Sequence, residues 1–280
     1  DQGFWIMRNA TTNKWCIGNA TNNGGSYSMY ISNDNGLNNT MSATTTYSYA
    51  MRKIHFSAGL YDVSYDWKAN GYNSTTYQYL RVFLIPTTAS FTGGSVYSGL
   101  TATALPSNAI SLDGNNAMLL QPTWTTYHNP IVSVPTTGDY FLVFFWYNYN
   151  SSVSSASYQP PAAIDNICIN TVSCPQPINL SKTDLGNGSI NLNWQTAGQR
   201  PAGWIIEYGR EGFVPGAGTK ITTYSPPPYT IRGLSINVTY DIYVRAICDS
   251  TDTSSYSEVL KFRYCQPSAG CIDFTNLSGQ

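Results

Sequence analysis

The titratable side chains of this 280-residue chain offer little catalytic chemistry. Its two histidines, His55 and His128, lie outside any HExxH zinc motif, and no GxSxG nucleophile turn occurs. All three glutamates lie beyond residue 200. Asp62 and Asp66 share one face of a predicted strand but stand roughly 13 Å apart, too far for a pair of glycosidase carboxylates on one sugar. The residue types therefore predict a non-catalytic chain.

Calcium is the ion that the oxygen-bearing side chains favour. The turn Asn33-Asp34-Asn35-Gly36 offers hard oxygen ligands, with Asp34 and Asn35 as candidates. The alternative is an ordinary turn, which selects Asn, Asp and Gly for positive φ without a metal. Asp165 lies inside an apolar strand, where an acid must be paired, hydrogen-bonded or metal-bound. It is the best single metal candidate, and calcium is the predicted cofactor.

Aromatic residues supply the candidate binding groups. The chain holds 22 tyrosines, and several aromatics flank the polar segment 148–159. Exposed Tyr and Trp give rigid contact area with a polar group, which suits sugars or protein partners. The alternative is that Trp124 and Trp146 are core residues, and that tyrosines take the place of charged residues on the surface of the sandwich. The predicted ligand-binding residues are Trp124, Tyr127, Tyr149 and Tyr158.

The six cysteines lack metal-ligand spacing and indicate disulfides formed in an oxidising compartment. Sequence alone allows about 15 pairings. The preferred set is Cys16 with Cys168, Cys174 with Cys248, and Cys265 with Cys271.

Composition excludes several classes of partner. Only 10% of the residues are charged and the net charge is -1, which removes the electrostatic signature of a nucleic-acid binder. The longest basic run is Arg52-Lys53. No stretch of about 18 apolar residues occurs, so no membrane insertion is expected.

Alternating hydrophobicity predicts an all-β chain with two domains. Residues 1–172 contain many short strands between polar turns, which indicates a jelly-roll β-sandwich. The run 140–147 is apolar on both faces and predicts a central strand. The strands expected in this domain are 4–8, 15–18, 27–32, 47–56, 60–68, 79–85, 117–120, 123–134, 139–148 and 162–169.

Residues 173–264 predict an immunoglobulin-like sandwich. Alternation from Tyr240 to Ala246 indicates a half-buried strand, and Leu234 with Tyr240 resembles a tyrosine corner, whose hydroxyl bonds backbone upstream. With the strands INLNW and WIIEY, this domain resembles fibronectin type III. Residues 265–280 are predicted to be a tail or the start of a further module.

The first domain resembles the cleaved-adhesin domains of gingipain-type surface proteases, which are MAM-like jelly rolls. The motifs TNKWCIG, SMYISNDNG, AGLYDVSYDWKANG, YLRVFLIP and AAIDNICI carry the resemblance in that order. The family often has an acid before the YLRVFL-type strand, where this chain has Gln78. That difference argues against a metal there, whereas the family's frequent calcium binding favours Asp165.

Together these features predict a secreted or cell-surface bacterial adhesin, part of a longer chain, that binds host glycans or glycoproteins through loops of the first domain. Three alternatives remain: accessory domains that target a larger secreted peptidase or glycan-degrading enzyme, a carbohydrate-binding module, and a structural spacer. Fold similarity cannot choose among them, because sandwiches host many functions.

Overall fold

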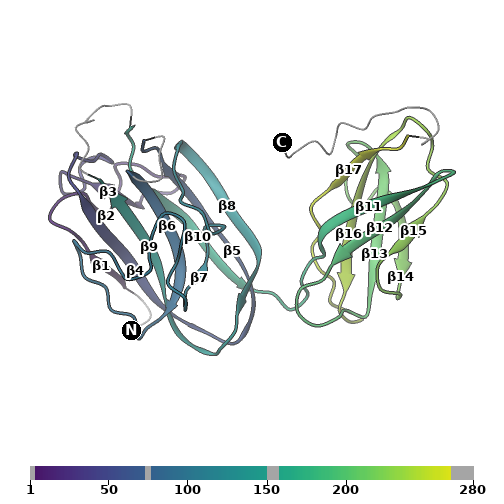
Figure 1. Ribbon diagram of the computed structural model, residues 1–280, viewed down its shortest axis with the longest axis horizontal. Coiled ribbons are helices and arrows are strands. Elements are labelled where there is room, and N and C mark those ends of the chain that lie inside the picture. Colours follow the sequence, from purple (N-terminus) through teal and green to yellow (C-terminus); the bar gives the residue numbers. More distant parts are fainter. Residues whose placement is uncertain (1–3, 73–76, 150–157, 266–280) are drawn as a thin grey trace. The chain divides into compact units, whose positions relative to one another are not determined.

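The structure is a computed structural model that describes residues 4–72, 77–149 and 158–265. These residues form β-strands and turns with no α-helix, so the all-β prediction is confirmed. The chain divides into two compact units, Asp1–Thr171 (unit 1) and Val172–Gln280 (unit 2), each with its own sheets (Figure 1). In the described ranges, no helix is long and apolar enough to cross a membrane.

Unit 1 is a sandwich of two five-stranded sheets. The first sheet has the order β1 (Trp5–Arg8), β4 (Thr46–Phe56), β9 (Gly138–Asn148), β6 (Gln78–Pro86) and β7 (Ile110–Ser111). The second has the order β2 (Lys14–Gly18), β3 (Ser28–Ser32), β10 (Ala163–Thr171), β5 (Gly59–Ala69) and β8 (Gln121–Val134). All neighbouring strands are antiparallel, which suits a sandwich built from hairpins and longer crossovers.

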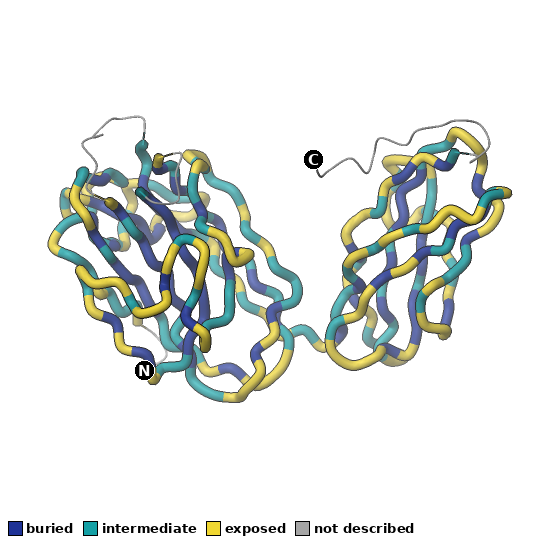
Figure 2. The backbone as a smooth tube through the Cα atoms, viewed as in Figure 1, coloured by how far each residue is buried: buried dark blue, intermediate teal, exposed yellow. Residues whose placement is uncertain are grey.

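The main core of unit 1 lies between the two sheets. On β4, Ala50 and Phe56 point into this core, whereas Tyr49 and Met51 point to the outer face of the first sheet. Residues 87–109 cover that outer face and bury Phe91 against it. Strand β9 is therefore buried on both faces, and the predicted central strand is confirmed (Figure 2).

A buried ion pair holds the covering segment in place. Arg81 and Asp113 are both fully buried, and Arg81 Nε donates to Asp113 Oδ2 at 2.5 Å. Arg81 Nη1 also donates to the carbonyl oxygen of Thr101, inside the covering segment. Because the guanidinium meets both a carboxylate and backbone carbonyls, the charge is satisfied where water does not reach.

One predicted strand is misplaced. Residues 117–120 make only a single bridge, between Met118 and Leu80, and Leu120 has a φ of 58°. The last strand of the first sheet is instead the two-residue β7. The apolar residues of 117–120 gave a strand-like pattern, but the positive φ at Leu120 ends regular pairing there.

Unit 2 is a second sandwich. Its sheets are β11 (Ile178–Gly186), β12 (Ser189–Gln195) and β15 (Tyr229–Ile231), and β14 (Thr219–Thr223), β13 (Gly203–Arg210), β16 (Thr239–Ile247) and β17 (Leu260–Arg263). Trp194 and Trp204 meet edge-on in the core at 5.7 Å. The Tyr240 hydroxyl accepts a hydrogen bond from Ser235 N at 2.9 Å, so the predicted tyrosine corner is present.

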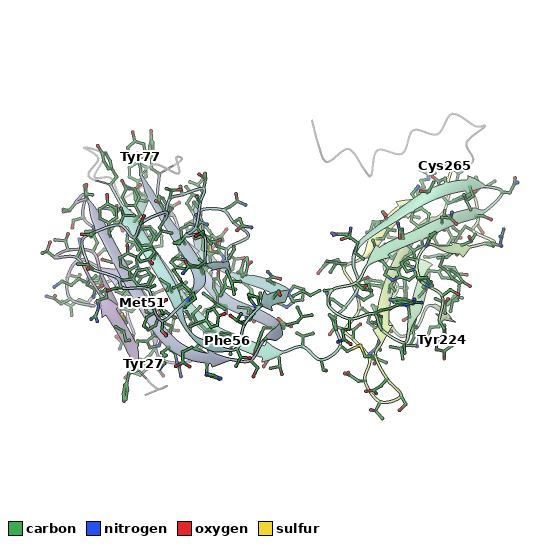
Figure 3. The ribbon with its side chains drawn as sticks, turned by 60° about the horizontal axis from the view of Figure 1, so that its bottom comes forward. Tyr27, Met51, Phe56, Tyr77, Tyr224 and Cys265 are labelled. Carbon is green, nitrogen blue, oxygen red and sulfur yellow. A yellow bond between two sulfur atoms is a disulfide. The ribbon has the colours of Figure 1, made fainter. Side chains whose placement is uncertain are left out.

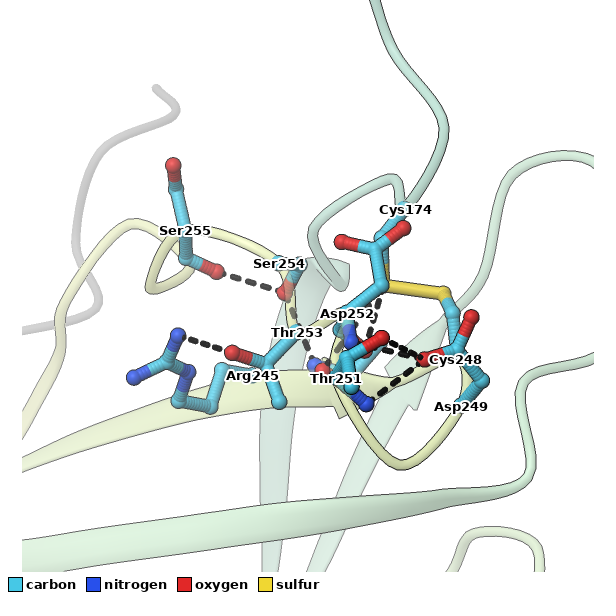
Figure 4. Close-up of a disulfide and its surroundings, with 10 residues drawn as sticks. Cys174, Arg245, Cys248, Asp249, Thr251, Asp252, Thr253, Ser254 and Ser255 are labelled. Carbon is cyan, nitrogen blue, oxygen red and sulfur yellow. Dashed lines mark hydrogen bonds between the residues drawn. A yellow bond between two sulfur atoms is a disulfide. The ribbon is translucent and has the colours of Figure 1, made fainter.

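The disulfide between Cys174 and Cys248 is confirmed (Figure 4). It joins the start of unit 2 to the end of β16, with 74 residues of separation and a Cα–Cα distance of 5.7 Å. The predicted bridge between Cys16 and Cys168 is wrong in this structure: neither is disulfide-bonded. Strand β3 lies between their strands, with Cys16 opposite Tyr30 and Tyr30 opposite Ala163, five positions before Cys168. Cys271, the predicted partner of Cys265, lies outside the described residues.

Candidate functional site

Three tyrosines lie in one row across the first sheet of unit 1. Tyr47 on β4 is opposite Tyr147 on β9, which is opposite Tyr79 on β6. The ring centroids are 5.2 Å apart for Tyr47 and Tyr147 and 5.0 Å for Tyr147 and Tyr79. Strand alternation puts all three on the same face as Tyr49, the outer face of the sheet.

Four further tyrosines extend the row at the end of the sandwich. Tyr149 N donates to the carbonyl oxygen of Tyr77 at 2.7 Å, and their rings meet edge-on at 5.7 Å. Tyr72 contacts both Tyr77 and Tyr158, with centroids 5.0 Å apart in each pair. Figure 3 shows Tyr77 at the opposite end of unit 1 from Phe56. We call this set the tyrosine surface: Tyr47, Tyr72, Tyr77, Tyr79, Tyr147, Tyr149 and Tyr158.

The tyrosine surface combines exposed rings with a buried base. Tyr149 and Tyr72 are 45% and 37% exposed, whereas Tyr79 is only 6% exposed. Burial, followed by the nearby Tyr147 hydroxyl, raises the pKa of Tyr79 to about 12; burial and the Tyr47 hydroxyl raise the pKa of Tyr147 to about 12. These phenols are neutral at physiological pH, so they can donate and accept hydrogen bonds without charge.

The structure unites two of the four predicted ligand-binding residues and separates the others. Tyr149 and Tyr158 belong to the tyrosine surface. Trp124 lies half-buried on β8 of the second sheet, where the Lys68 ammonium is 5.2 Å from its ring centroid. Tyr127 stacks on Tyr65 at 5.1 Å and packs against the core. Trp146 is fully buried, as the core interpretation predicted.

Sequence reasoning missed five members of the tyrosine surface, although a signal for them exists. The pattern Tyr-x-Tyr occurs at 47–49, 77–79 and 147–149. Each copy lies at or next to the end of one of three neighbouring strands, β4, β6 and β9. Because residues two apart on a strand share a face, the repeat places six rings on one side of the sheet once the strand order is known.

Asp34 is held by its own turn. Its carboxylate accepts hydrogen bonds from Ser32 Oγ at 2.6 Å, Asn38 N at 2.9 Å and Asn38 Nδ2 at 2.8 Å. The Ser32 hydroxyl, then the Asn38 amide, lowers the pKa of Asp34 to about 2. Asn35 has a φ of 61° and its side chain has no role in these contacts. The geometry matches the ordinary turn that was the alternative to a metal site.

Asp165 is hydrogen-bonded next to a second acid. It lies opposite Asp66 on β5, and Asn23 N donates to Asp165 Oδ2 at 2.8 Å. Asn23 Nδ2 and Asn166 Nδ2 donate to Asp66 Oδ2 at 2.9 and 2.7 Å. Burial raises the pKa of Asp66, but these bonds and one from Thr126 outweigh it and leave the pKa lowered. These carboxylate and amide oxygens could hold calcium, which stays a prediction.

The two histidines of unit 1 each contact one aspartate. His55 Nδ1 lies 2.8 Å from Asp139 Oδ1, and His128 Nε2 lies 2.8 Å from Asp62 Oδ1, both at exposed positions. Among the described side chains, no group of three or more His, Cys, Asp or Glu residues is placed to hold a metal ion.

Comparison with known families identifies unit 2. Residues 174–263 match the family model described as Fibronectin type III domain. The chain therefore contains a fibronectin type III domain. The disulfide at Cys174 and the corner at Tyr240 both lie within it. The resemblance of unit 1 to gingipain-type adhesin domains stays a prediction.

Three solved structures are examples of those similar to this chain. One is FN1-FN3 of chicken CNTN1, with 12% identity over 68% of this chain and 57% of that chain, and a TM-score of 0.30. Another is the adhesin domain of Epf from Streptococcus pyogenes, with 12% identity over 85% of this chain and 79% of that chain, and a TM-score of 0.28. A third is the glycoside hydrolase domain of Endo-D from Streptococcus pneumoniae R6, with 9% identity over 93% of this chain and 37% of that chain, and a TM-score of 0.32. A search of curated proteins gave no match.

Proposed function

We propose that unit 1 is a recognition module. It binds a neutral host glycan, either free or attached to a glycoprotein, at the tyrosine surface. The observation that supports the proposal is the placement of two sets of contacting tyrosine rings at the ends of neighbouring strands. A sugar ring presents an apolar C–H face and several hydroxyls, so it is matched by an aromatic face that also carries hydroxyls. Tyr149 and Tyr72 supply exposed faces, and the row from Tyr47 to Tyr79 supplies a rigid base.

In this proposal the fibronectin type III domain has no catalytic part and serves as a spacer. The chain belongs to a secreted or outer-surface protein with further domains, and calcium at Asp165 would stiffen the second sheet. The pairs of acids and histidines that the structure describes do not form a nucleophile with its base, which supports a binding role over catalysis.

The test is binding of the full chain to an array of neutral, sialylated and sulfated glycans, with calcium and again with chelator. We expect neutral glycans to bind. Tyr149→Ala and Tyr77→Ala should each weaken binding about tenfold, or about 1.4 kcal/mol, because each removes one exposed or supporting ring. Tyr27→Ala is the matched control, because Tyr27 is 66% exposed in the same unit but outside the tyrosine surface.

Two results would contradict the proposal. Equal binding by Tyr149→Ala and wild type would show that the tyrosine surface is not the site. Absence of any glycan signal would leave the spacer or the accessory domain of a larger enzyme. Loss of binding in chelator, reproduced by Asp165→Asn, would place calcium in the module.

A further inference from the structure

A second candidate site lies between the two sheets of unit 1, away from the tyrosine surface. It is an open cavity of about 240 Å³. Its walls are Trp5 from β1, residues 52–54 (Arg-Lys-Ile) of β4, Leu142 from β9, and Ile167 and Ile169 from β10. On β4, Ile54 lies seven residues from Tyr47, roughly 23 Å along the strand. The two sites are therefore separate.

The first sheet contributes one row of side chains. Trp5 is opposite Arg52, and Arg52 is opposite Leu142, across β1, β4 and β9. Arg52 shares the inward face of β4 with Ala50 and Ile54, which pack in or against the main core. An arginine on a core-facing position of an otherwise apolar row is unusual, because the charge must stay near water or a counter-charge. It lies here at the open side of the core.

A bulge in β10 supplies the opposite wall. Register with β5 shifts between Asp165 and Cys168, and Asn166 has a φ of 50°. The extra residue changes which side chains face inward, because alternation along a strand has a period of two. Ile167 and Ile169 consequently point to the core, while Cys168 is exposed. Without the bulge, the polar side chains of this strand would face the cavity.

The cavity is open because the second sheet narrows beside it. Strand β3 pairs with β10 only at Ala163 and Ile164, and β1 is the outermost strand of the first sheet. In the described part of the chain, no strand pairs with β10 on its β3 side beyond Ile164. Ile167 and Ile169 are therefore only half-buried, and an apolar ligand group would complete their burial.

The residues that line the cavity carry positive charge, which favours an anionic ligand. Arg52 and Lys53 form the longest basic run of the chain, and no lining residue is acidic. Lys53 Nζ is bound to Asp139 at 2.7 Å, and Arg52 already takes part in an interaction. A guanidinium has five N–H donors, so one arginine can donate to a carboxylate and to a second acceptor together. We propose that this cavity binds a small amphiphilic carboxylate, with its apolar chain on Trp5 and the isoleucines and its carboxylate near Arg52.

The cavity size sets the chain length. A water molecule takes about 30 Å³ in the liquid, so the cavity has room for about eight non-hydrogen atoms. The seven-carbon alkyl chain of octanoate fits this volume with its carboxylate at the open side near Arg52, whereas a longer chain would extend into solvent. With so few atoms buried, binding should be weak, in the range of about 0.1 to a few mM.

Octanoate is the probe, and octylammonium, with the same chain and the opposite charge, is its control. Titrations of the full chain followed by NMR should show octanoate binding about tenfold more tightly. Intermolecular NOEs should join octanoate methylenes to the methyl groups of Ile54, Ile167 and Ile169 in the wild type. Arg52→Gln should reduce the preference for octanoate to near equality.

Ile169→Trp fills the cavity and should abolish octanoate binding, while Ile17→Trp, at a 55% exposed position of β2, should leave it unchanged. The NOE experiment keeps the test valid if Ile169→Trp fails to fold. Absence of octanoate binding at millimolar concentration, equal binding of octylammonium, or NOEs confined to residues outside the cavity would each overturn the proposal. Glycan binding should not respond to Ile169→Trp, so failure here and failure at the tyrosine surface are distinguishable.

Discussion

The Asp34 carboxylate shows how a polar turn replaces charge pairing in a chain with few charged residues. Its hydrogen bonds to Ser32 and Asn38 favour the ionised form and lower its pKa to about 2. Since the folded pKa lies below the ordinary value near 4, these bonds add stability above about pH 4. That contribution should be lost as the pH falls from about 4 through about 2.

The measurement is an NMR titration of the Asp34 carboxyl carbon. Ser32→Ala removes the hydrogen bond that lowers the Asp34 pKa most, so the titration midpoint of Asp34 should move upward toward the ordinary carboxyl value. A wild-type midpoint close to 4 would contradict the hydrogen-bonded turn.

The buried pair Arg81–Asp113 should be the costliest polar contact to break in unit 1. Arg81→Met leaves Asp113 fully buried with no opposite charge, which costs about 3–5 kcal/mol. It also releases the Thr101 carbonyl oxygen, so the segment 87–109 should lose protection from hydrogen exchange first.

Lys53→Met is the matched control, because the Lys53–Asp139 pair lies in the same unit with side chains 43% and 35% exposed. Exposed pairs contribute less than about 1 kcal/mol. Urea unfolding, followed by the NMR signals of unit 1, compares the two variants. Similar costs for both would refute the structural role assigned to Arg81.

At the scale of strands, the tyrosine corner makes a specific prediction for unit 2. Tyr240→Phe removes the acceptor for Ser235 N but keeps the ring in the core. The expected cost is about 1 kcal/mol, the net value of one hydrogen bond. Tyr224→Phe should be neutral, because Tyr224 is 70% exposed. Equal stability of the two variants in thermal unfolding would show that the corner bond adds nothing.

Strand positions could be predicted from the sequence where apolar and polar residues alternate regularly. They were predicted less well where this alternation is interrupted. The alternation from Tyr240 to Ala246 predicted β16, and the run 140–147 predicted a central strand, because burial on one or two faces leaves a direct periodic trace. Residues 117–120 were misplaced because Leu120 adopts a φ that leucine rarely has.

The candidate site was harder to predict because it depends on strand order. Tyr149 and Tyr158 were found from their place beside a polar segment. Tyr47 and Tyr79 meet Tyr147 only because β9 lies between β4 and β6, which are far from it in the chain. The cavity at Ile169 depends on a bulge in β10. The three-residue step from Ile164 to Ile167 breaks the alternation in the sequence, but it does not show which strands pair around the break.

At the scale of the whole chain, each unit has its own core and its own sheets, so each should unfold in a separate transition. The disulfide offers a way to test this independence. It closes a loop of 74 residues inside unit 2 and makes no link to unit 1. The chain-entropy model gives a contribution of about 4 kcal/mol for a loop of this length, an upper value.

Replacing both Cys174 and Cys248 by Ser should therefore lower one calorimetric transition and leave the other in place. The lowered transition is that of unit 2, which NMR signals of Trp194 and Trp204 identify, because both side chains lie in its core. Cys168→Ser is the matched control, since Cys168 is exposed and not disulfide-bonded, and it should move neither transition. A downward shift of both transitions in the double variant would mean that the units stabilise each other, and the fibronectin type III domain would then be more than a spacer.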